Sequence, residues 1–281
     1  MEGNFRFKPI TMSNNYQQTI NQLEKKNEKA LVVFTVIGDS DYDTSLSIVK
    51  SILKGGADIL ELGFPFSDPI ADGTTIQSAD IRALSNNINT DICFKFIEEI
   101  RKFTKIPIGL LVYYNLIYQR GIEKFYRDAK TAGVNSILIA DMPIEESEYV
   151  MSSANRNKIN QVFIISPLTN DRRVKLISKA SGGFLYLVSR LGVTGAKPEL
   201  EEDTLRLIKR VRTKTELPLF VGFGISKPEH VRGVIKAGAD GSIVGSAVVK
   251  IIEENLDNKD LMLEMIEKFV RELKNATKYG L

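Results

Sequence analysis

The sequence has very few of the residues that build metal sites and disulfide frameworks. Its 281 residues include one cysteine, Cys93, and one histidine, His230. A single cysteine excludes an intramolecular disulfide, and a zinc site needs several cysteine or histidine ligands. The sequence therefore predicts no metal site and favours a reducing compartment. We expect Cys93 to be a packing residue, and His230, close to a predicted helix start at Pro228, to lie on the surface.

The chain also lacks an excess of charge and a long apolar segment. Its 38 Lys and Arg residues against 35 Asp and Glu residues leave a net charge of +3, which argues against a nucleic-acid partner. No apolar run approaches the ~20 residues of a membrane-spanning helix, and the polar start has neither a signal-peptide core nor a transit-peptide composition. These absences predict no membrane partner and a cytoplasmic location, or the plastid stroma if the gene is plastid-encoded.

The sequence does contain a regular alternation of apolar and amphipathic segments. The run 31–37 (LVVFTVI) is apolar and rich in β-branched residues, which is typical of a strand buried on both faces. With similar short runs it gives the predicted strands 31–37, 59–62, 108–112, 136–139, 161–165, 184–188, 219–221 and 242–244. Amphipathic stretches predict helices at 16–29, 41–54, 91–103, 122–132, 171–179, 204–213 and 228–237.

This order of elements indicates the fold class. Alternating strands and helices imply a parallel sheet with right-handed crossovers and helices outside. Eight such units in about 250 residues favour a closed (β/α)₈ TIM barrel over a doubly wound sheet, for which no GxGxxG motif follows the first strand. We predict a single α/β barrel domain over residues 1–281, with extra helices at the N-terminus and within 251–281.

One acidic side chain interrupts an otherwise apolar predicted strand. Glu61 lies between Leu60 and Leu62, where an ionised carboxylate needs a partner, a raised pKa or a chemical task. Barrel active sites form where the strands end, and Glu61 lies near such an end with Asp72 in the following loop. We interpret them as an acid/base pair in which burial raises the pKa of Glu61 while Asp72 stays ionised. A structural Glu61 and an ordinary Asp-Gly turn at Asp72 are the alternatives.

The loops after the last two predicted strands have the glycine pattern of an anion site. Residues 222–226 (GFGIS) follow one strand and Gly245-Ser246 the other, and barrels commonly bind phosphate at these loops. Backbone amides and helix N-termini can hold an anion without Lys or Arg. Tight turns that need glycine for a positive φ are the alternative.

Three further features on the same predicted face are less specific. Tyr186 lies within the sixth predicted strand, so it is either a core residue or a hydrogen-bond partner of a carboxylate. The polar loop 190–197 (RLGVTGAK) is typical of a mobile lid. Asp68 precedes Pro69 and is equally well explained as a turn residue.

Several of these segments resemble one known family. The α subunits of tryptophan synthase are similar to this chain in the runs ELGFPFSDPIADGTTIQ, IPIGLLVYYN, ADMP, YLVSRLGVTG, GFGIS and GSAVVKIIE, and the whole resemblance runs from about residue 31 to residue 274. The first of these runs is highly specific to the family. The resemblance implies a lyase that cleaves indole-3-glycerol phosphate to indole and D-glyceraldehyde 3-phosphate in L-tryptophan biosynthesis, without a metal or an organic cofactor.

The resemblance also implies roles for individual residues. Glu61 and Asp72 match the family's catalytic carboxylates, and Tyr186 matches the tyrosine beside them. Glu61 would transfer protons at indole C3, and Asp72 would hold the indole N–H. The lid of the family matches the loop that begins at Arg190, in which Thr194 matches the threonine that engages the catalytic Asp. The phosphate-binding positions match Gly195, Gly224, Gly245 and Ser246.

The family's partner is a pyridoxal-phosphate-dependent β subunit. The resemblance implies an α2β2 heterotetramer in which indole passes directly to that subunit, so pyridoxal phosphate is expected only in the partner. Asn115 and the loop 65–74 would face the β subunit, with Asp68 and Pro69 in that loop. Asp68 is then a candidate for an ion pair across the interface.

Four positions depart from the family pattern, one of them Val36, which stands where a threonine is common. Gly38-Asp39-Ser40 stands where the family has Gly-Asp-Pro, Phe64 replaces a smaller aliphatic residue, and Thr74 replaces the proline after the catalytic Asp-Gly. The loss of that proline removes a φ restraint, which predicts a less ordered loop and weak activity without the β subunit. The residues leave three alternatives open, namely a free-standing indole-releasing lyase, a phosphate-binding isomerase barrel, and a non-catalytic barrel that activates a β subunit.

Overall fold

The computed structural model describes residues 15–188, 202–222 and 224–279, which form one parallel sheet wound into a barrel. The order of its strands is β5-β4-β3-β2-β1-β9-β8-β7-β6. The strands are β1 (Ala30–Val36), β2 (Ile59–Gly63), β3 (Ile108–Val112), β4 (Ser136–Ile139), β5 (Asn160–Val162), β6 (Ile164–Ile165), β7 (Leu185–Val188), β8 (Leu219–Gly222) and β9 (Gly241–Val244). Only Phe163 separates β5 from β6, so the two edges of the sheet belong to one segment and the barrel is nearly closed. The predicted fold class is confirmed.

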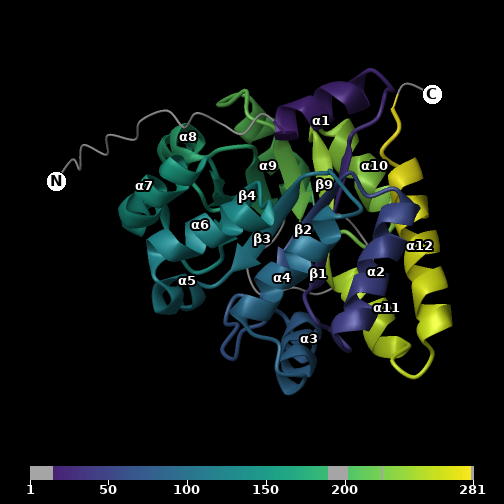
Figure 1. The fold of residues 1–281 in the computed structure, drawn as a ribbon. Helices are drawn as coiled ribbons and strands as arrows, with labels where there is room; N and C mark the ends of the chain where they lie inside the picture. Colours follow the sequence, from purple (N-terminus) through teal and green to yellow (C-terminus); the bar gives the residue numbers. More distant parts are fainter. Residues whose placement is uncertain (1–14, 189–201, 223, 280–281) are drawn as a thin grey trace.

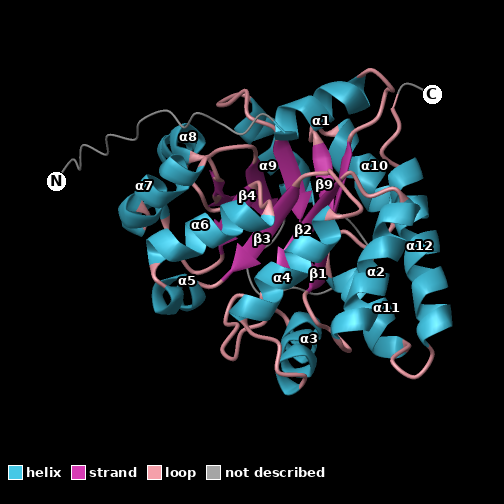
Figure 2. Cartoon of the chain, viewed as in Figure 1, coloured by secondary structure: helices cyan, strands magenta, loops and turns pink. Residues whose placement is uncertain are grey.

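Helices alternate with the strands and cover the outside of the barrel (Figures 1 and 2). They are α1 (Asn15–Glu24), α2 (Tyr42–Gly55), α3 (Thr74–Ser85), α4 (Thr90–Arg101), α5 (Tyr114–Arg120), α6 (Ile122–Ala132), α7 (Glu148–Asn157), α8 (Asp171–Ala180), α9 (Glu202–Arg212), α10 (Pro228–Lys236), α11 (Ser246–Glu254) and α12 (Lys259–Asn275), with a 3₁₀ turn at Ile144–Glu146. None of these helices, within the part of the chain that is described, is long and apolar enough to cross a membrane.

Successive side chains of each strand enter two different cores. Leu31 and Val33 of β1 pack outward against the helices, whereas Val32 points into the barrel with Phe220 and Ile243. Period-two alternation across a strand requires this division, and burial on both sides explains why the strand sequences are so continuously apolar. A carboxylate at an inward position therefore lies inside the barrel, away from the helices.

The N-terminal helix closes the barrel at the end opposite to the carboxyl ends of the strands. Tyr16 of α1 is 1% exposed, its hydroxyl lies 2.6 Å from Ser136 Oγ of β4, and its ring packs 5.2 Å from that of Phe184. Figure 1 shows α1 and α3 at opposite ends of the strands. The described residues thus fill the barrel at the end covered by α1, and a ligand enters from the opposite end, which carries the strand-to-helix loops.

Two local differences from the sequence-based expectation have clear causes. The first helix ends at Glu24 rather than Lys29, because Asn27 adopts a left-handed conformation with φ 55°, which asparagine tolerates. The larger Phe64 is accommodated by an aromatic cluster, with its ring 5.2 Å from that of Phe94 and 5.9 Å from that of Phe125. Cys93 of α4 is buried, as expected for a packing residue.

Candidate active site

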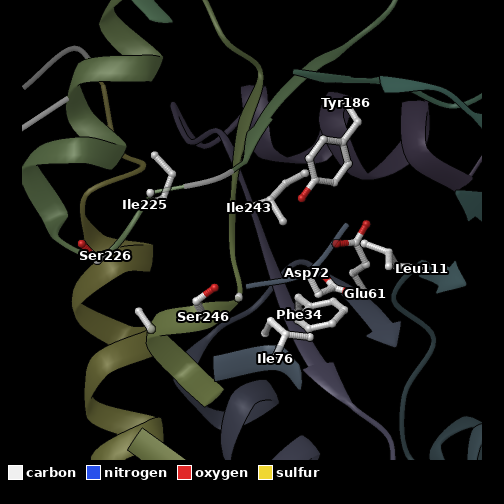
Figure 3. A pocket seen from close by; sticks show the side chains of 13 residues that line it. Phe34, Glu61, Asp72, Ile76, Leu111, Tyr186, Ile225, Ser226, Ile243 and Ser246 are labelled. Carbon is white, nitrogen blue, oxygen red and sulfur yellow. The ribbon is translucent and has the colours of Figure 1, made fainter. Parts of the chain in front are cut away.

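A cavity of about 560 Å³, measured with its open mouth, lies at the carboxyl ends of the strands. Figure 3 shows Glu61, Asp72 and Tyr186 on one side of it and Ser226 and Ser246 on the other. Its lining consists of Phe34, Glu61, Asp72, Ile76, Leu111, Tyr186, Gly224, Ile225, Ser226, Ile243, Gly245, Ser246 and Ala247. The cavity therefore has a carboxylate side, an apolar floor and a side rich in backbone amides.

Glu61 is held on the rigid strand β2 and faces the cavity. It pairs in register with Phe34 of β1 and Gly109 of β3, and it is 3% exposed. Its Oε2 is buried and has no hydrogen-bond partner among the described residues. Burial, and secondarily the nearby charge of Asp72, raises the pKa of Glu61 from 4.5 to about 8. At neutral pH this side chain is a neutral acid with a proton to give.

Asp72 is buried although it lies on a loop. It is 8% exposed, and the Tyr113 hydroxyl donates a hydrogen bond of 2.7 Å to its Oδ2. The same hydroxyl accepts the Ala71 N–H at 3.0 Å, and Gln77 Nε2 donates to the Asp72 carbonyl at 2.8 Å. Burial raises the pKa of Asp72, and the bond from Tyr113 opposes that shift. Tyr113, just beyond β3, thus fixes both the backbone and the carboxylate of this loop.

Helix α3 follows Asp72 directly and explains how the loop can do without proline. Gly73 is its N-cap and Thr74 its first residue, the position at which proline is favoured because its N–H has no helical partner. A threonine there loses the φ restraint but not the helix. This helix is not predicted from the sequence, because its apolar residues occur on both its buried and its exposed faces.

A third buried carboxyl supports the loop from α3. Asp80 is 4% exposed and accepts the backbone N–H of Phe66, and burial together with the charges of Asp72 and Asp39 raises its pKa to about 8. The Phe66 ring stacks on Tyr113 with centroids 5.0 Å apart. Asp80, Phe66 and Tyr113 therefore form a continuous support behind Asp72. Asp39 belongs to the Gly-Asp-Ser segment that differs from the family pattern. Its buried carboxylate forms an ion pair of 2.6 Å with Arg82 of α3, which neutralises its charge.

Tyr186 of β7 is both a core residue and a neighbour of the carboxylates, the two positions between which the sequence did not decide. It packs in the inner core and is 5% exposed, and it also lines the cavity beside the two carboxylates (Figure 3). Burial and the charges of Glu61 and Asp72 raise its pKa well above the ordinary value, so its hydroxyl keeps its proton. Gly222 of β8 makes this placement possible, because a Cβ atom there would lie 2.5 Å from the Tyr186 hydroxyl.

The opposite side of the cavity is made of backbone at two helix starts. Gly224 has a φ of +81°, which demands glycine, and it leads through Ser226 into α10. Gly245 is the N-cap of α11 and Ser246 its first residue, so their amides lie where the helix dipole favours an anion. The model thus places three of the four predicted phosphate-binding residues on one wall of the cavity.

His230 was expected at the surface, and that prediction is wrong. The residue lies in the first turn of α10, is 3% exposed, and its Nδ1 lies 3.0 Å from Gly224 O and 3.3 Å from Ser226 N. The loop folds back over the helix start and covers the ring, which a local sequence pattern does not reveal. Tyr113 was not predicted as a site residue, because it lies 41 positions from Asp72 in the sequence and only the fold brings the two together.

The remaining predicted residues lie outside the cavity or outside the described residues. Gly195, Arg190 and Thr194 fall within 189–201, which the structure does not describe. Asp68 and Asn115 are exposed at the same end of the barrel, and Pro69 is half-buried. Asp68 and Asn115 are therefore accessible to another molecule without taking part in the cavity.

Comparisons of sequence identify similar proteins across nearly the whole chain. A family model described as tryptophan synthase alpha chain matches residues 20–278. The tryptophan synthase alpha chain of Methanothermobacter thermautotrophicus is 53% identical over 247 residues, which cover 88% of this chain and 92% of the relative. That of Photobacterium profundum is 46% identical over 264 residues, which cover 94% of this chain and 98% of the relative.

Solved structures with the same fold are similarly complete matches. One from Aquifex aeolicus superposes with a TM-score of 0.86 at 37% identity, covering 94% of this chain and 99% of that one. A chain of a tryptophan synthase complex from Pyrococcus furiosus superposes with a TM-score of 0.80 at 37% identity, covering 88% of this chain and 98% of that one.

Proposed function

Because this chain belongs to the tryptophan synthase alpha chain family, we propose that Glu61, Asp72 and Tyr186 carry out the reaction of that family in the cavity at the strand ends. The reaction is the cleavage of indole-3-glycerol phosphate in tryptophan biosynthesis, so the chain is an indole-3-glycerol-phosphate lyase. The observation that carries the assignment of residues is the buried Glu61 carboxyl, whose Oε2 has no hydrogen-bond partner among the described residues.

Glu61 is the proton donor in this proposal. Cleavage of the bond between the indole ring and the glycerol chain requires C3 of indole to accept a proton, so that the ring can act as the electron sink. A pKa raised to about 8 keeps the donor protonated at neutral pH and close enough to that pH to release its proton. After that transfer the Glu61 carboxylate can accept the proton of the glycerol hydroxyl as the carbon–carbon bond breaks, which restores the acid.

Asp72 and Tyr186 bind the ring that changes charge. Protonation of C3 places positive charge on the indole nitrogen, and a carboxylate that accepts the indole N–H stabilises it. Asp72 is suited to this because the Tyr113 hydroxyl bond fixes its Oδ2 and favours the ionised form. Tyr186, which keeps its proton, offers a neutral hydroxyl beside Glu61 without competing as a second acid.

The substrate phosphate would bind across the cavity at Gly224, Gly245 and Ser246. The two helix starts supply amides and dipoles for an anion, and the apolar side chains between the two sides, such as Phe34 and Leu111, suit a flat aromatic ring. The carboxylates and the apolar side chains would thus hold the indole ring, and the amides on the opposite side would hold the phosphate, with the glycerol chain between them.

Substitution of Glu61 by Gln tests this assignment directly. We expect indole release from indole-3-glycerol phosphate to fall by several orders of magnitude, because the isosteric amide cannot donate the proton, while binding of glyceraldehyde 3-phosphate is kept. Steady-state assay of indole release, with calorimetric titration of glyceraldehyde 3-phosphate as the binding control, measures both. A Glu61→Gln protein with full activity would overturn the mechanism.

We also propose a β subunit of tryptophan synthase as the partner, in an α2β2 assembly. Its support is that solved Pyrococcus furiosus relatives of this fold are described as a tryptophan synthase complex and as an α2β2 complex, and that Asp68 and Asn115 are exposed at the cavity end. The β subunit would bring pyridoxal phosphate, and the loop before Asp72 would lie between the two active sites. Addition of a β subunit should raise indole release by this chain, and an Asp68→Ala variant should respond less. An identical rate with and without the β subunit would favour a free-standing lyase.

A further inference from the structure

We propose that Arg82 is a positioning residue for the reaction, because it bridges the helix that follows Asp72 and the helix that starts at the proposed phosphate site. The inference rests on the proposed function, since it takes one end of the cavity to bind indole and the other to bind phosphate. Arg82 does not belong to the cavity lining. Its effect on the reaction therefore acts through α3 and α11.

Helix α3 is an addition to the barrel and has to be fixed to it by side chains. The basic barrel unit has one helix between two strands, whereas both α3 and α4 lie between β2 and β3. The first turn of α3 includes Ile76, which lines the cavity, and Gln77 Nε2 donates to the Asp72 carbonyl at 2.8 Å. The position of Asp72 thus depends on the position of α3.

Arg82 lies in the last turn of α3 and joins this helix to two other parts of the barrel. Its Nε and Nη2 donate to the two carboxylate oxygens of Asp39, in the loop after β1, at 2.6 and 3.1 Å. Its Nη1 donates to Glu253 Oε1, near the end of α11, at 3.3 Å. The Asp39 side chain is 0% exposed and that of Glu253 is 39% exposed. The two bonds to Asp39 are therefore the stronger anchor, and the bond to Glu253 is a weaker one.

Helix α11 places the other end of the cavity. Gly245 is its N-cap, and Ser246 and Ala247 are its first residues, all of which line the cavity. Helices α3 and α11 are in contact and lie next to each other in Figure 1. Each has its first turn at the cavity and its last turn at the Arg82–Glu253 contact. One guanidinium between the last turns therefore holds the two first turns at a fixed separation.

A substrate that spans both ends of the cavity should depend on this separation. Indole-3-glycerol phosphate carries its ring and its phosphate on one short chain, so a shift of one helix relative to the other misplaces the bond that breaks. Indole alone and glycerol 3-phosphate alone each occupy one end and can follow a small shift of that end. Glycerol 3-phosphate has no aldehyde, so it cannot condense with indole.

The double variant Asp39→Asn/Arg82→Met removes the anchor without leaving an unpaired charge in the core. We expect its kcat/KM for indole-3-glycerol phosphate to fall about tenfold, which is less than the ~100-fold that a 1 Å misplacement can cost. The dissociation constants of indole and of glycerol 3-phosphate, each titrated alone by calorimetry, should stay at their wild-type values. Arg212→Met is the matched control, because Arg212 pairs with Asp240 before β9, at the opposite end of the barrel, and its kcat/KM should be unchanged.

Glu253→Ala tests the bridge to α11 while the buried pair of Asp39 and Arg82 stays intact. We expect kcat/KM for indole-3-glycerol phosphate to fall about threefold, as for the loss of a partly exposed ion pair. In an Arg82→Lys background, whose single ammonium group can neutralise Asp39 but cannot form the same fork, Glu253→Ala should cost nothing further.

A Glu253→Ala protein with wild-type kcat/KM would overturn the bridge, even if the double variant does not fold. A double variant that loses kcat/KM and the binding of both small ligands to the same extent would also overturn the proposal, because a general loosening of the fold would explain it. Wild-type protein that releases no indole or does not bind glycerol 3-phosphate would instead contradict the proposed function, so the two failures are distinguishable.

Discussion

The two ends of the cavity meet a ligand in different ways. At one end, Glu61, Asp72 and Tyr186 act through side chains whose proton affinity is set by burial. At the other end, Gly224 in the turn before α10 and Gly245, the N-cap of α11, offer backbone amides, with no Lys or Arg among the described residues that line the cavity. The first end supplies chemistry and the second supplies position.

This difference determines how each end responds to mutation. Removal of a side chain from the carboxylate end removes a reacting group, and nothing nearby replaces it. Removal of a side chain from the amide end leaves the backbone donors in place, so damage there requires a change in backbone shape. The predictions that follow test this contrast, beginning with the position at which the two ends meet.

Among the substitutions that change no reacting group, Gly222→Ala should have the largest effect. The added Cβ would lie 2.5 Å from the Tyr186 hydroxyl and 2.7 Å from its ring, so Tyr186 must move away from Glu61. Overpacking of this kind also strains the fold, and a displacement of about 1 Å at an active site can cost about 100-fold in rate. We expect kcat for indole release to fall by about that factor. In a Tyr186→Ala background the same substitution should cost almost nothing, and equal losses in both backgrounds would contradict the steric explanation.

The free energy of unfolding should depend on pH in a way that a carboxylate exposed on the surface would not produce. The pKa of Glu61 is about 8 in the folded protein against an ordinary 4.5, so between these values the folded state holds a proton that the unfolded state has released. The free energy of unfolding then falls as pH rises through that window, and levels off above pH 8. Glu61→Gln should remove the Glu61 share of this slope, leaving the share of Asp80, whose pKa is also raised to about 8, and the variant should gain a few kcal/mol of stability relative to wild type across the window. Urea denaturation at a series of pH values measures it, and parallel curves for the two proteins would be inconsistent with a raised pKa.

Tyr113→Phe should weaken the carboxylate end without touching its reacting groups. The variant loses the 2.7 Å bond to Asp72 Oδ2 and the acceptor of the Ala71 N–H, which frees the carboxylate and lets its pKa rise. We expect kcat/KM to fall about tenfold, as for one hydrogen bond to a charged group. Tyr114→Phe, at the next position, leaves the bond from Tyr113 to Asp72 in place and is the matched control, and an equal loss in both variants would refute the role of Tyr113.

Ser246→Ala should have the smallest effect. The substitution removes one hydroxyl at the start of α11 and leaves the amides of residues 245 and 246 and the helix dipole intact. Water can replace the hydroxyl, so we expect KM to rise only about fivefold with kcat unchanged. A loss of kcat comparable to that of Gly222→Ala would show that the amide end takes part in the chemistry and would remove the contrast between the two ends.

Much of the fold could be predicted from the sequence because strand burial leaves a strong local signal. Strands such as β1 are continuously apolar since both faces are covered, and glycine ends helices such as α2, whose C-cap Gly56 has a φ of 100°. Glu61 was conspicuous for the same reason, as an acid at a position that the pattern reserves for apolar side chains. Helix α3 lacked such a signal, because its apolar residues are not confined to one face: Ile76 and Ala79 are buried, whereas Ile81 and Leu84 are exposed.

The parts of the site that escaped prediction all depend on tertiary contacts. Tyr113 is one of two adjacent tyrosines, and only the folded loop selects it as the partner of Asp72. Asp80 resembles any helical carboxylate until α3 packs over the barrel mouth. His230 follows a helix start that looked exposed, and Gly222 appeared to serve a ligand, whereas its smallness makes room for Tyr186. Sequence patterns therefore indicated the residues of the proposed site that line the cavity better than the residues that hold them in place.

The protonation of Glu61 is the central claim, and an infrared titration measures it most directly. The difference spectrum between wild type and Glu61→Gln isolates the carboxyl stretch of this one side chain. A protonated carboxyl band that persists at neutral pH and disappears near pH 8 is the predicted result. A band that disappears near pH 4.5, the ordinary value for glutamate, would contradict the account, because Glu61 would then have no proton to give to indole.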